Sequence, residues 1–406
     1  MKTYVWVAVL LVLFACIAPH FTSPRAHAQD PTPPFDNLED FHAALNTAVQ
    51  AGDIESFWER VVAAGQMPLI FDSTAVFLYR GAAESVAWQG GFSGWEAKPE
   101  FTGTRQGHTD LWLMQHEFPQ DTRLNYKILL DGHRDILDPL NPHEEDTGLG
   151  FASELRMPGW EPSPATIPRD DIAQGTLSDD ILIDSHRLGY AVTYRVYTPA
   201  GYEPLGALPT IYVMDGEWYL DPHKGNMLTV LDNLIAEGLI EPVIAVFIDP
   251  RDPVYRYENR RQDEYNARPS YAAFVATELV PAIDAAYPTD PAPDARAILG
   301  TSIGGSNAAY FGLTRSDTFH LIGIQSPAFQ LVLWMLPEYE KATDLPLKIF
   351  MSVGTVWDGF YYARQMRDIM EQQGYPLLYI EVTDEHAWGN WRNLLDDLLI
   401  YFFPPE

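Results

Sequence analysis

A serine flanked by glycines is the feature of the sequence with the clearest chemical meaning. Residues 300–304 read GTSIG, after an apolar run at 296–299 and before a helix-forming stretch. The pattern G-x-S-x-G between a strand and a helix is typical of a tight turn that presents a serine hydroxyl above a sheet. We expect Gly300 and Gly304 to be needed for space, because side chains there would collide with the neighbouring strand and helix. Ser302 is therefore the predicted nucleophile.

A serine hydroxyl is a poor nucleophile near neutral pH, so it needs a base within hydrogen-bond reach and a third group that orients the base. His386 follows the predicted strand 377–382, and Asp358 follows the predicted strand 347–353. Such groups gather beyond the carboxyl ends of the strands in open α/β sheets, so both should lie near Ser302. The chain order of the three residues is that of α/β-hydrolases.

Other residues could take these roles. Asp384 and Glu385 immediately precede the histidine, but a neighbour one or two positions away rarely reaches the far imidazole nitrogen, so Asp358 ranks first. His320 stands before a buried strand, at its starting edge, and is predicted to pack. His223 lies in a loop that could border the pocket, and it stays open as an alternative base.

An acyl-transfer site also needs donors for the developing oxyanion. The backbone amide of Ile303, directly after the serine, is the first candidate. The predicted strand 210–214 ends in Asp215-Gly216-Glu217. The amide of Gly216 or Glu217 is the second candidate, because glycine lets the backbone approach the reacting centre. An ordinary Asp-Gly turn is the alternative.

Aromatic and basic side chains near these loops are candidates for binding a substrate. Aromatic walls suit a planar acyl group or a sugar-linked ester, although such residues often just pack the core. Arg261, in a charged cluster with Arg260 and Glu264, could hold an anionic group or form an exposed ion pair. The aromatic candidates are Trp218, Tyr219, Trp357, Trp388 and the neighbouring Trp391.

No cofactor or metal is expected. Residues 143–146 read HEED, but contiguous side chains do not converge on one ion, and the spacing matches no zinc or calcium loop. The sequence has no Gly-rich phosphate loop or dinucleotide fingerprint. The formal charge of -30, spread along the chain, argues against nucleic acid and anionic membranes as partners. A small-molecule or sugar-linked ester is the expected partner, and the oligomeric state is left open.

The first residues predict a secretory signal peptide over 1–28. A basic start precedes an apolar stretch, 4–18, that is too short for a confident membrane span, and small residues at 26–28 form an A-x-A site. Export to the periplasm or the extracellular space is the favoured interpretation. Cys16 is the single cysteine, and lipid anchoring there is less favoured because the neighbouring Phe14 is too bulky for the usual cleavage pattern.

The spacing of apolar residues and the proline content divide the rest of the chain into four predicted segments. We predict a Pro-rich lead-in and helical segment over 29–74, and short strands separated by glycines, typical of an immunoglobulin-like β-sandwich, over 75–160. A Pro-rich linker is expected over 161–175. From 176 to 406 apolar strands alternate with helices, which predicts a mostly parallel sheet covered by helices on both faces.

Four segments resemble the enterochelin esterase and esterase D group of serine esterases. The resemblance implies an α/β-hydrolase fold with Ser302, Asp358 and His386 as triad, but this chain has Glu385 where that family often has glycine. Residues 40–160 also resemble the early-set immunoglobulin-like domain of enterochelin esterases. The segments are 299–305 (LGTSIGG), 213–216 (VMDG), 278–281 (ELVP) and 385–388 (EHAW).

The related group also contains feruloyl and acetyl-xylan esterases and mycolyl transferases, so the resemblance implies the chemistry more closely than the substrate. An exported serine esterase acting on siderophore or aromatic and sugar-linked esters is the leading hypothesis. The alternatives are an acyltransferase or peptidase on the same fold, and a non-catalytic protein that binds a glycan or a partner.

Overall fold

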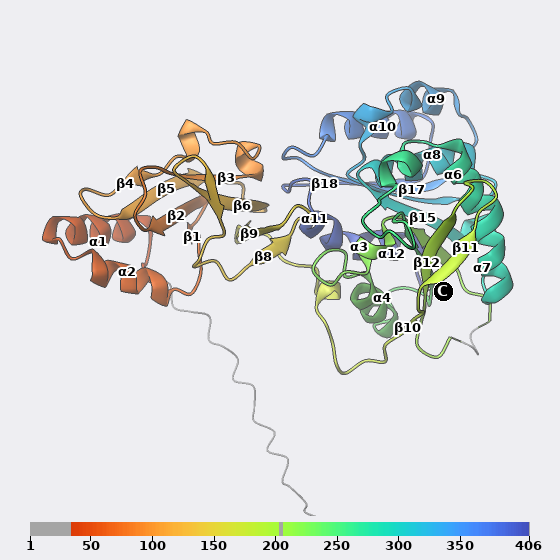
Figure 1. Ribbon diagram of the computed structural model, residues 1–406, viewed down its shortest axis with the longest axis horizontal. Helices are drawn as coiled ribbons and strands as arrows, with labels where there is room; N and C mark the ends of the chain where they lie inside the picture. Colours follow the sequence, from red (N-terminus) through yellow and green to blue (C-terminus); the bar gives the residue numbers. More distant parts are fainter. Residues whose placement is uncertain (1–33, 203–205, 406) are drawn as a thin grey trace, which may run out of the picture.

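The computed structural model describes residues 34–202 and 206–405, which form two units joined by a proline-rich segment (Figure 1). The predicted signal segment, with Cys16, lies outside the described residues. In the part of the chain that is described, no helix is long and apolar enough to cross a membrane.

The N-terminal unit consists of two helices and two antiparallel sheets. The helices are α1 (Leu38–Ala51) and α2 (Ile54–Ala63). The first sheet has the order β1-β2-β5-β4, with β1 (Leu69–Phe71), β2 (Thr74–Arg80), β5 (Leu111–Glu117) and β4 (Thr104–Arg105). The second has the order β3-β6-β9-β8 with β7 on β6, and comprises β3 (Val86–Gly90), β6 (Arg123–Leu130), β9 (Phe151–Arg156), β8 (Glu144–Asp146) and β7 (Arg134–Ile136).

Strand β2 is buried on both faces, and this explains how the helices and sheets join. Ala75 and Phe77 pack with residues of the second sheet, whereas Val76 and Leu78 pack with α1 and α2. Alternate side chains of a strand point to opposite faces, so one apolar run serves two cores. The expected helical segment is therefore present, and it covers the outer face of a β-sandwich. Whether this sandwich is of the immunoglobulin class stays a prediction.

The C-terminal unit is built on a nine-stranded sheet. Its order is β10-β12-β14-β13-β15-β16-β17-β18, with β11 on β12, and every pair from β14 to β18 is parallel. The antiparallel strands are β10 (Thr176–Leu177), β11 (Ile181–Asp184) and β12 (Ala191–Thr198). The parallel strands are β13 (Thr210–Val213), β14 (Ile244–Asp249), β15 (Arg296–Thr301), β16 (Leu321–Gln325), β17 (Lys348–Gly354) and β18 (Leu377–Val382).

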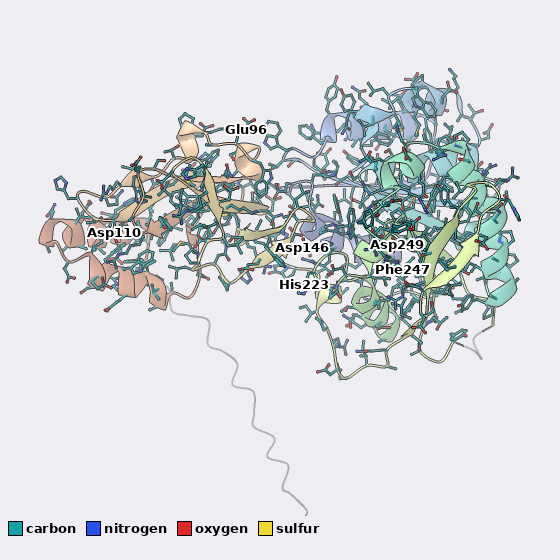
Figure 2. All side chains as sticks on the ribbon, viewed as in Figure 1. Glu96, Asp110, Asp146, His223, Phe247 and Asp249 are labelled. Atoms are coloured by element: carbon teal, nitrogen blue, oxygen red, sulfur yellow. The ribbon has the colours of Figure 1, made fainter. Side chains whose placement is uncertain are left out.

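Helices cover both faces of this sheet, as predicted for an α/β-hydrolase-like fold. Tyr212 of β13 packs on one face, while Ile211 of the same strand packs on the other. Phe247 of β14, labelled in Figure 2, packs in the same cluster as Ile211. The first face carries α6 (Pro269–Phe274), α7 (Val280–Ala286), α8 (Ile303–Thr314), α9 (Met335–Lys341) and α10 (Phe360–Gln372). The second carries α4 (Met227–Ala236), α11 (Trp388–Asn393) and α12 (Leu395–Phe402).

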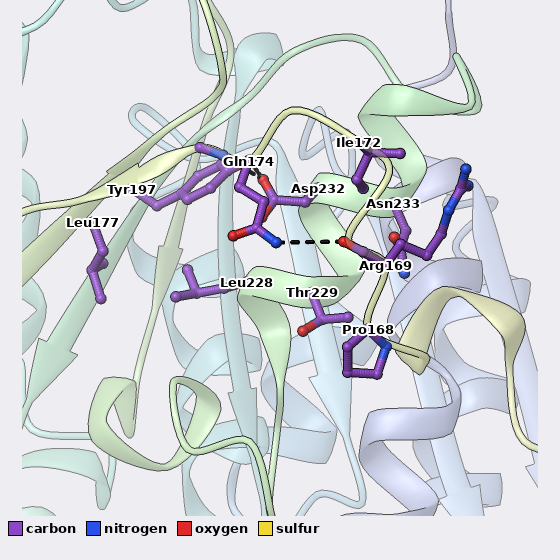
Figure 3. A pocket seen from close by; sticks show the side chains of 11 residues that line it. Pro168, Arg169, Ile172, Gln174, Leu177, Tyr197, Leu228, Thr229, Asp232 and Asn233 are labelled. Atoms are coloured by element: carbon purple, nitrogen blue, oxygen red, sulfur yellow. Dashed lines mark hydrogen bonds between the residues drawn. The ribbon is translucent and has the colours of Figure 1, made fainter. Parts of the chain in front are cut away.

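The predicted linker 161–175 is fixed to the C-terminal unit. The Asn233 side chain on α4 donates to the carbonyl oxygens of Ala165 and Ile167 at 2.8 and 2.9 Å. The Ser163 hydroxyl donates to Asp396 at 2.6 Å. Later residues of the segment line a pocket of about 170 Å³ against α4 (Figure 3). Proline gives the segment an extended backbone, and these bonds hold it in place.

Candidate active site

Ser302 occupies a sharp turn between β15 and α8, with φ 61° and ψ −122°. Its amide donates to the carbonyl oxygen of Gln325 on the adjacent strand at 2.9 Å. A Cβ atom at Gly300 would overlap the backbone of Gly304, and one at Gly305 would overlap the Gln325 carbonyl oxygen. At Gly304 the nearest atom would be 3.5 Å away. The expectation that Gly304 is needed for space is therefore wrong, and Gly305 has that role because β16 runs behind it.

The structure brings Ser302, His386 and Asp358 together from three strand ends. His386 Nε2 lies 2.9 Å from Ser302 Oγ. His386 Nδ1 contacts Asp358 Oδ1, whose side chain is buried, while the imidazole is 39% exposed. If Nδ1–H donates to the carboxylate, Nε2 is left free to accept the serine proton. The arrangement thus has the geometry needed to activate a hydroxyl.

Three donors orient the other oxygen of Asp358. Its Oδ2 accepts from the Ser326 hydroxyl and the Gly354 amide at 2.5 Å each, and the Asn390 side-chain amide lies at 3.4 Å. The Trp391 indole donates to Ser326 Oγ at 2.7 Å. Sequence reasoning missed Ser326 and Asn390. Ser326 directly follows β16, so a search of every strand end would have found it.

The alternative carboxylates do not serve the imidazole. Asp384 Oδ1 lies 3.4 Å from a guanidinium nitrogen of Arg123 in the sandwich. Glu385 Oε1 accepts from the Asn125 amide at 2.6 Å. Both side chains are thus directed at the N-terminal unit.

The alternative bases lie elsewhere in the fold. His320 precedes β16 and its Nδ1 is 2.7 Å from Asp294 Oδ1, an arrangement that fits the predicted packing role. His223 lies near Asp146 at the junction of the two units (Figure 2), where Lys224 donates to Asp146 at 2.6 Å. Of the three candidates, His386 is the one bonded to Ser302.

The predicted oxyanion donors begin two helices. Ile303 is the first residue of α8, and Gly216 is the first residue of the short α3 (Gly216–Tyr219). The first amides of a helix have no partner within it, so those of Ile303, Gly216 and Glu217 are available in principle. A Cβ at Gly216 would overlap the backbone of Phe247, so glycine is needed there. Asp215 and Gly216 therefore form the tightly packed N-terminus of α3 and not an ordinary turn.

The Glu217 side chain lines a pocket that it shares with Arg251 and Asp249. Within residues 34–202 and 206–405 its carboxylate accepts no hydrogen bond from another residue, although Arg251 Nε lies 3.7 Å away. Burial, followed by the nearby charge of Asp215, raises the pKa of Glu217 to about 8.

The Arg261 side chain is bonded to other residues of the fold. Its Nε donates to the buried Asp215 carboxylate at 2.7 Å, and its Nη2 donates to the Thr301 carbonyl oxygen at 3.1 Å. The predictions that it forms an exposed ion pair or holds a substrate anion are not supported, because its side chain is only 13% exposed. Arg261 instead joins the end of β13 to the strand that carries Ser302.

Glu264, from the same cluster, should make stability depend on pH. It is buried on α5 (Arg261–Tyr265), accepts from the Tyr190 hydroxyl at 2.9 Å, and burial raises its pKa from about 4.5 to about 7. Because the folded state binds this proton more tightly, its stabilisation is complete below pH 4.5 and is lost as pH rises through 7. Relative to Glu264→Gln, the wild type should lose about 3 kcal/mol of unfolding free energy between pH 4 and pH 8.

Urea titrations at several pH values measure this difference. Glu338→Gln, which removes an exposed carboxylate paired with Lys341, is the control and should follow the wild-type profile. Parallel profiles for Glu264→Gln and the wild type would contradict the assignment.

The aromatic candidates divide into core and surface residues. Tyr219 and Trp388 are buried, their rings are 5.2 Å apart, and the Tyr219 hydroxyl donates to Gln325 at 2.8 Å. They pack beneath the site, so their prediction as substrate contacts is wrong. Trp218 is half-buried and packs edge-on against Trp388. Trp357 is 67% exposed and remains a candidate contact.

A pocket of about 220 Å³ adjoins His386 at the junction of the two units. Sequence reasoning assigned no site residue to the sandwich, yet most of this lining comes from it. Trp95 and Leu149 are exposed there, 40% and 97% respectively. The lining residues are Trp95, Asn125, Lys127, Thr147 and Leu149 of the sandwich, with Glu385, His386 and Ala387.

No group of three or more His, Cys, Asp or Glu side chains among the described residues could hold a metal ion.

Comparison with known proteins shows that the chain is similar to esterases. Residues 185–359 match the family described as "Putative esterase". An iron(III) enterobactin esterase of Escherichia coli is 27% identical over 48% of this chain and 46% of its own length. An endo-1,4-beta-xylanase/feruloyl esterase of Xylanibacter ruminicola is 24% identical over 62% of this chain and 34% of its own. The chain thus spans less than half the length of these two relatives.

A solved structure extends the likeness to both units. The enterobactin esterase FES from Shigella flexneri, determined in the presence of enterobactin, covers 81% of this chain and 92% of its own with a TM-score of 0.67. At 21% identity this likeness bears on the fold. Taken with the match of residues 185–359, the segment that contains Ser302 and Asp358, to the "Putative esterase" family, this makes the chain similar to enterobactin esterases in both sequence and fold.

Proposed function

We propose that the protein is a serine esterase that works through an acyl-enzyme, with Ser302 as nucleophile, His386 as base and Asp358 as the group that orients the base. The observation that carries the proposal is the continuous contact from Ser302 Oγ through the imidazole to the buried carboxylate. A serine turn without such a base would be an unreactive hydroxyl.

The residues imply a two-step reaction. As Ser302 Oγ attacks the ester carbonyl carbon, His386 Nε2 takes the hydroxyl proton, and the carbonyl oxygen becomes an oxyanion. The amide of Ile303 and that of Gly216 or Glu217 stabilise this charge. The intermediate collapses, His386 protonates the leaving alcohol, and the acyl group stays on Ser302. Water then gives a proton to His386, attacks the acyl carbon and releases the acid, and the proton returns to Ser302.

We further propose aromatic esters as substrates, either siderophore-type or sugar-linked. Support comes from the pocket beside His386, where Trp95 and Leu149 offer apolar surface for a planar acyl group and Lys127 offers a positive charge. The two curated relatives are named as an iron(III) enterobactin esterase and an endo-1,4-beta-xylanase/feruloyl esterase. Trp218 and Trp357 are further candidate contacts.

The export signal and the domain boundaries are also proposed. We propose export directed by residues 1–28, with the catalytic unit over 176–406 and the linker over 161–175. The sandwich over 75–160, whose outer face is covered by α1 and α2 of the segment 29–74, is proposed to be of the early-set immunoglobulin type.

Active-site labelling tests the function. A fluorophosphonate probe should attach once per chain, at Ser302, in the folded protein, and peptide mapping should locate the adduct. Labelling should disappear on denaturation, because Ser302 reacts only when His386 is in place. A folded protein that is not labelled would favour a non-catalytic binding protein.

Product analysis separates the enzymatic alternatives. A panel of siderophore esters, feruloyl sugars, acetylated glycans and short peptides, assayed with and without added alcohol or sugar acceptors, should give the free acid as main product. Acyl transfer to the acceptor would indicate a transferase, and cleavage confined to peptides would indicate a peptidase.

A further inference from the structure

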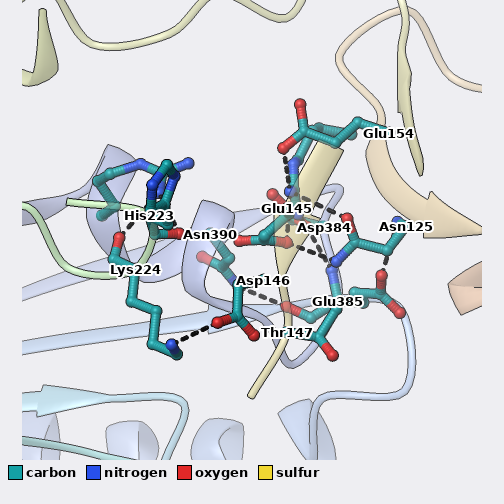
Figure 4. Close-up of polar contacts among 12 residues, drawn as sticks. Asn125, Glu145, Asp146, Thr147, Glu154, His223, Lys224, Asp384, Glu385 and Asn390 are labelled. Atoms are coloured by element: carbon teal, nitrogen blue, oxygen red, sulfur yellow. Dashed lines mark hydrogen bonds and ion pairs between the residues drawn. The ribbon is translucent and has the colours of Figure 1, made fainter. Parts of the chain in front are cut away.

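The segment directly before the catalytic histidine is bonded to the other unit of the protein. Residues 383–385 leave β18 and meet β6 of the sandwich (Figure 4). The Arg123 amide donates to the Thr383 carbonyl oxygen at 3.0 Å, and the Asn125 amide donates to the Glu385 side chain at 2.6 Å. The sandwich therefore donates hydrogen bonds to the backbone and to a side chain of the loop that carries the base.

Arg123 supplies a charge at the centre of this junction. Its side chain is fully buried, and its Nη2 contacts Glu145 and Glu154 of the sandwich at 2.5 and 2.6 Å. Its Nη1 lies 3.4 Å from Asp384 of the loop. A Cβ atom at Gly389, in the helix that follows the histidine, would overlap the guanidinium. The guanidinium thus lies against the chain on both sides of the histidine.

Glu385 has both carboxylate oxygens engaged by the sandwich. Oε1 accepts from the Asn125 amide, and Oε2 accepts from the Trp95 indole at 3.1 Å. The side chain is buried, and a Cβ atom at Gly91 of the sandwich would overlap its carboxylate. The backbone of the N-terminal unit is therefore shaped to receive this one side chain.

The same loop is linked to the acid of the site. The Asn390 side-chain amide donates to the Glu385 carbonyl oxygen at 3.0 Å and lies 3.4 Å from Asp358 Oδ2. A shift of the loop would therefore change the distance between the imidazole and the carboxylate as well as that between the imidazole and the serine. A misplacement of about 1 Å costs on the order of 100-fold in rate.

The polar contacts at the junction indicate that it positions the histidine loop in addition to joining the two units. Apolar packing would join two units as well or better, because desolvating ions is costly. Ion pairs and hydrogen bonds depend on the orientation of the two groups, so they fix the position of a loop more closely than apolar packing does. Here three consecutive loop residues make such contacts. Catalytic side chains keep their productive positions only when the groups that hold them are themselves fixed.

We propose that the sandwich positions the catalytic base, and that Arg123 and Glu385 are positioning residues for His386. The inference rests on the proposed function of His386 and extends it across the junction. The N-terminal unit thereby takes part in catalysis through contacts that never touch the reacting atoms.

Glu385→Ala is the direct test. It removes both bonds to the sandwich while leaving the triad intact. We expect kcat for p-nitrophenyl acetate to fall about 10- to 100-fold with little change in KM, and the rate of fluorophosphonate labelling to fall in parallel. In proton NMR, the downfield resonance of the His386 Nδ1 proton should shift or broaden. Loss of stability alone would not move that resonance in the folded protein.

Two further variants keep the test decisive. Glu385→Gln retains an acceptor for the Asn125 amide and should recover most of the lost kcat. Asp384→Asn replaces the carboxyl group that lies 3.4 Å from Arg123 by an amide of nearly equal volume, and it should lower kcat several-fold. The matched control is Glu381→Ala, which breaks an ion pair with Arg364 inside the C-terminal unit and should leave kcat and the resonance unchanged.

The outcomes separate the two proposals. If Ser302→Ala keeps its turnover, the proposed function fails. If turnover depends on Ser302 but the folded Glu385→Ala and Asp384→Asn variants keep kcat and the Nδ1 resonance, only the positioning role is overturned. Should Glu385→Ala not fold, the kcat, the resonance and the labelling rate of Asp384→Asn decide, and parental values in that variant would overturn the inference.

Discussion

Ser302→Ala should lower kcat for p-nitrophenyl acetate by about 10⁴- to 10⁶-fold, because the acyl-enzyme can no longer form. Residual catalysis by the oxyanion donors and by substrate binding, about 10³-fold over water, should remain. Among the residues that the structure describes, the side chain of Ser302 is bonded only to the imidazole, so the variant should unfold at the same temperature as the wild type. Stopped assays with purified protein and circular dichroism measure both properties.

Ser306→Ala is the matched control. Ser306 lies one turn further along α8 and donates to the Ile303 carbonyl oxygen at 3.1 Å, so it shares the helix without facing the imidazole. Its turnover should stay within a few-fold of the wild type. Turnover of Ser302→Ala above about one tenth of the wild-type rate would exclude Ser302 as nucleophile.

Asp358→Asn should lower kcat by about 10⁴-fold, the effect of a wrong imidazole tautomer in such triads. The geometry explains why. Donors from Ser326, Gly354 and Asn390 all meet at Oδ2, so the asparagine oxygen will take that place and its NH₂ group will face His386. Nδ1 must then accept, Nε2 carries the proton, and the imidazole cannot take a proton from the serine.

Comparison with Asp384→Asn identifies the acid of the triad. Both changes replace a buried carboxylate by an amide of nearly equal size, but Asp384 faces Arg123 and not the imidazole. The loss of kcat should therefore be at least 100-fold larger for Asp358→Asn. The reverse order would contradict the assignment of Asp358.

The strand ends were the part of the site that sequence reasoning could locate. Ser302, Asp358 and His386 each follow an apolar run, and parallel strands bring their carboxyl ends to one edge of the sheet. Local pattern and topology together are enough to place the three residues near one another. The same reasoning extended to every strand would have included Ser326.

Other features depend on contacts that no local pattern contains. Tyr219 and Trp388 look like pocket walls in sequence, yet both are buried against each other, and the Tyr219 hydroxyl is bonded to Gln325 of β16. Arg261 reads as a surface charge, but its partner Asp215 is 46 residues away. The need for Gly305 rather than Gly304 depends on which carbonyl of β16 passes behind the turn. Burial and pairing of this kind are set by tertiary packing.

The junction between the sandwich and the histidine loop also determines when the site is completed during synthesis. The bonds from Asn125 and Trp95 to Glu385 span 260 and 290 residues of chain. An N-terminal unit folds first on the ribosome, so it is in place before β18 and its loop have been made. The sandwich then serves as a template on which the last-made part of the catalytic unit settles. A shortened chain that ends before residue 383 would lack both the base and the loop that anchors it, so premature release yields no partly active enzyme.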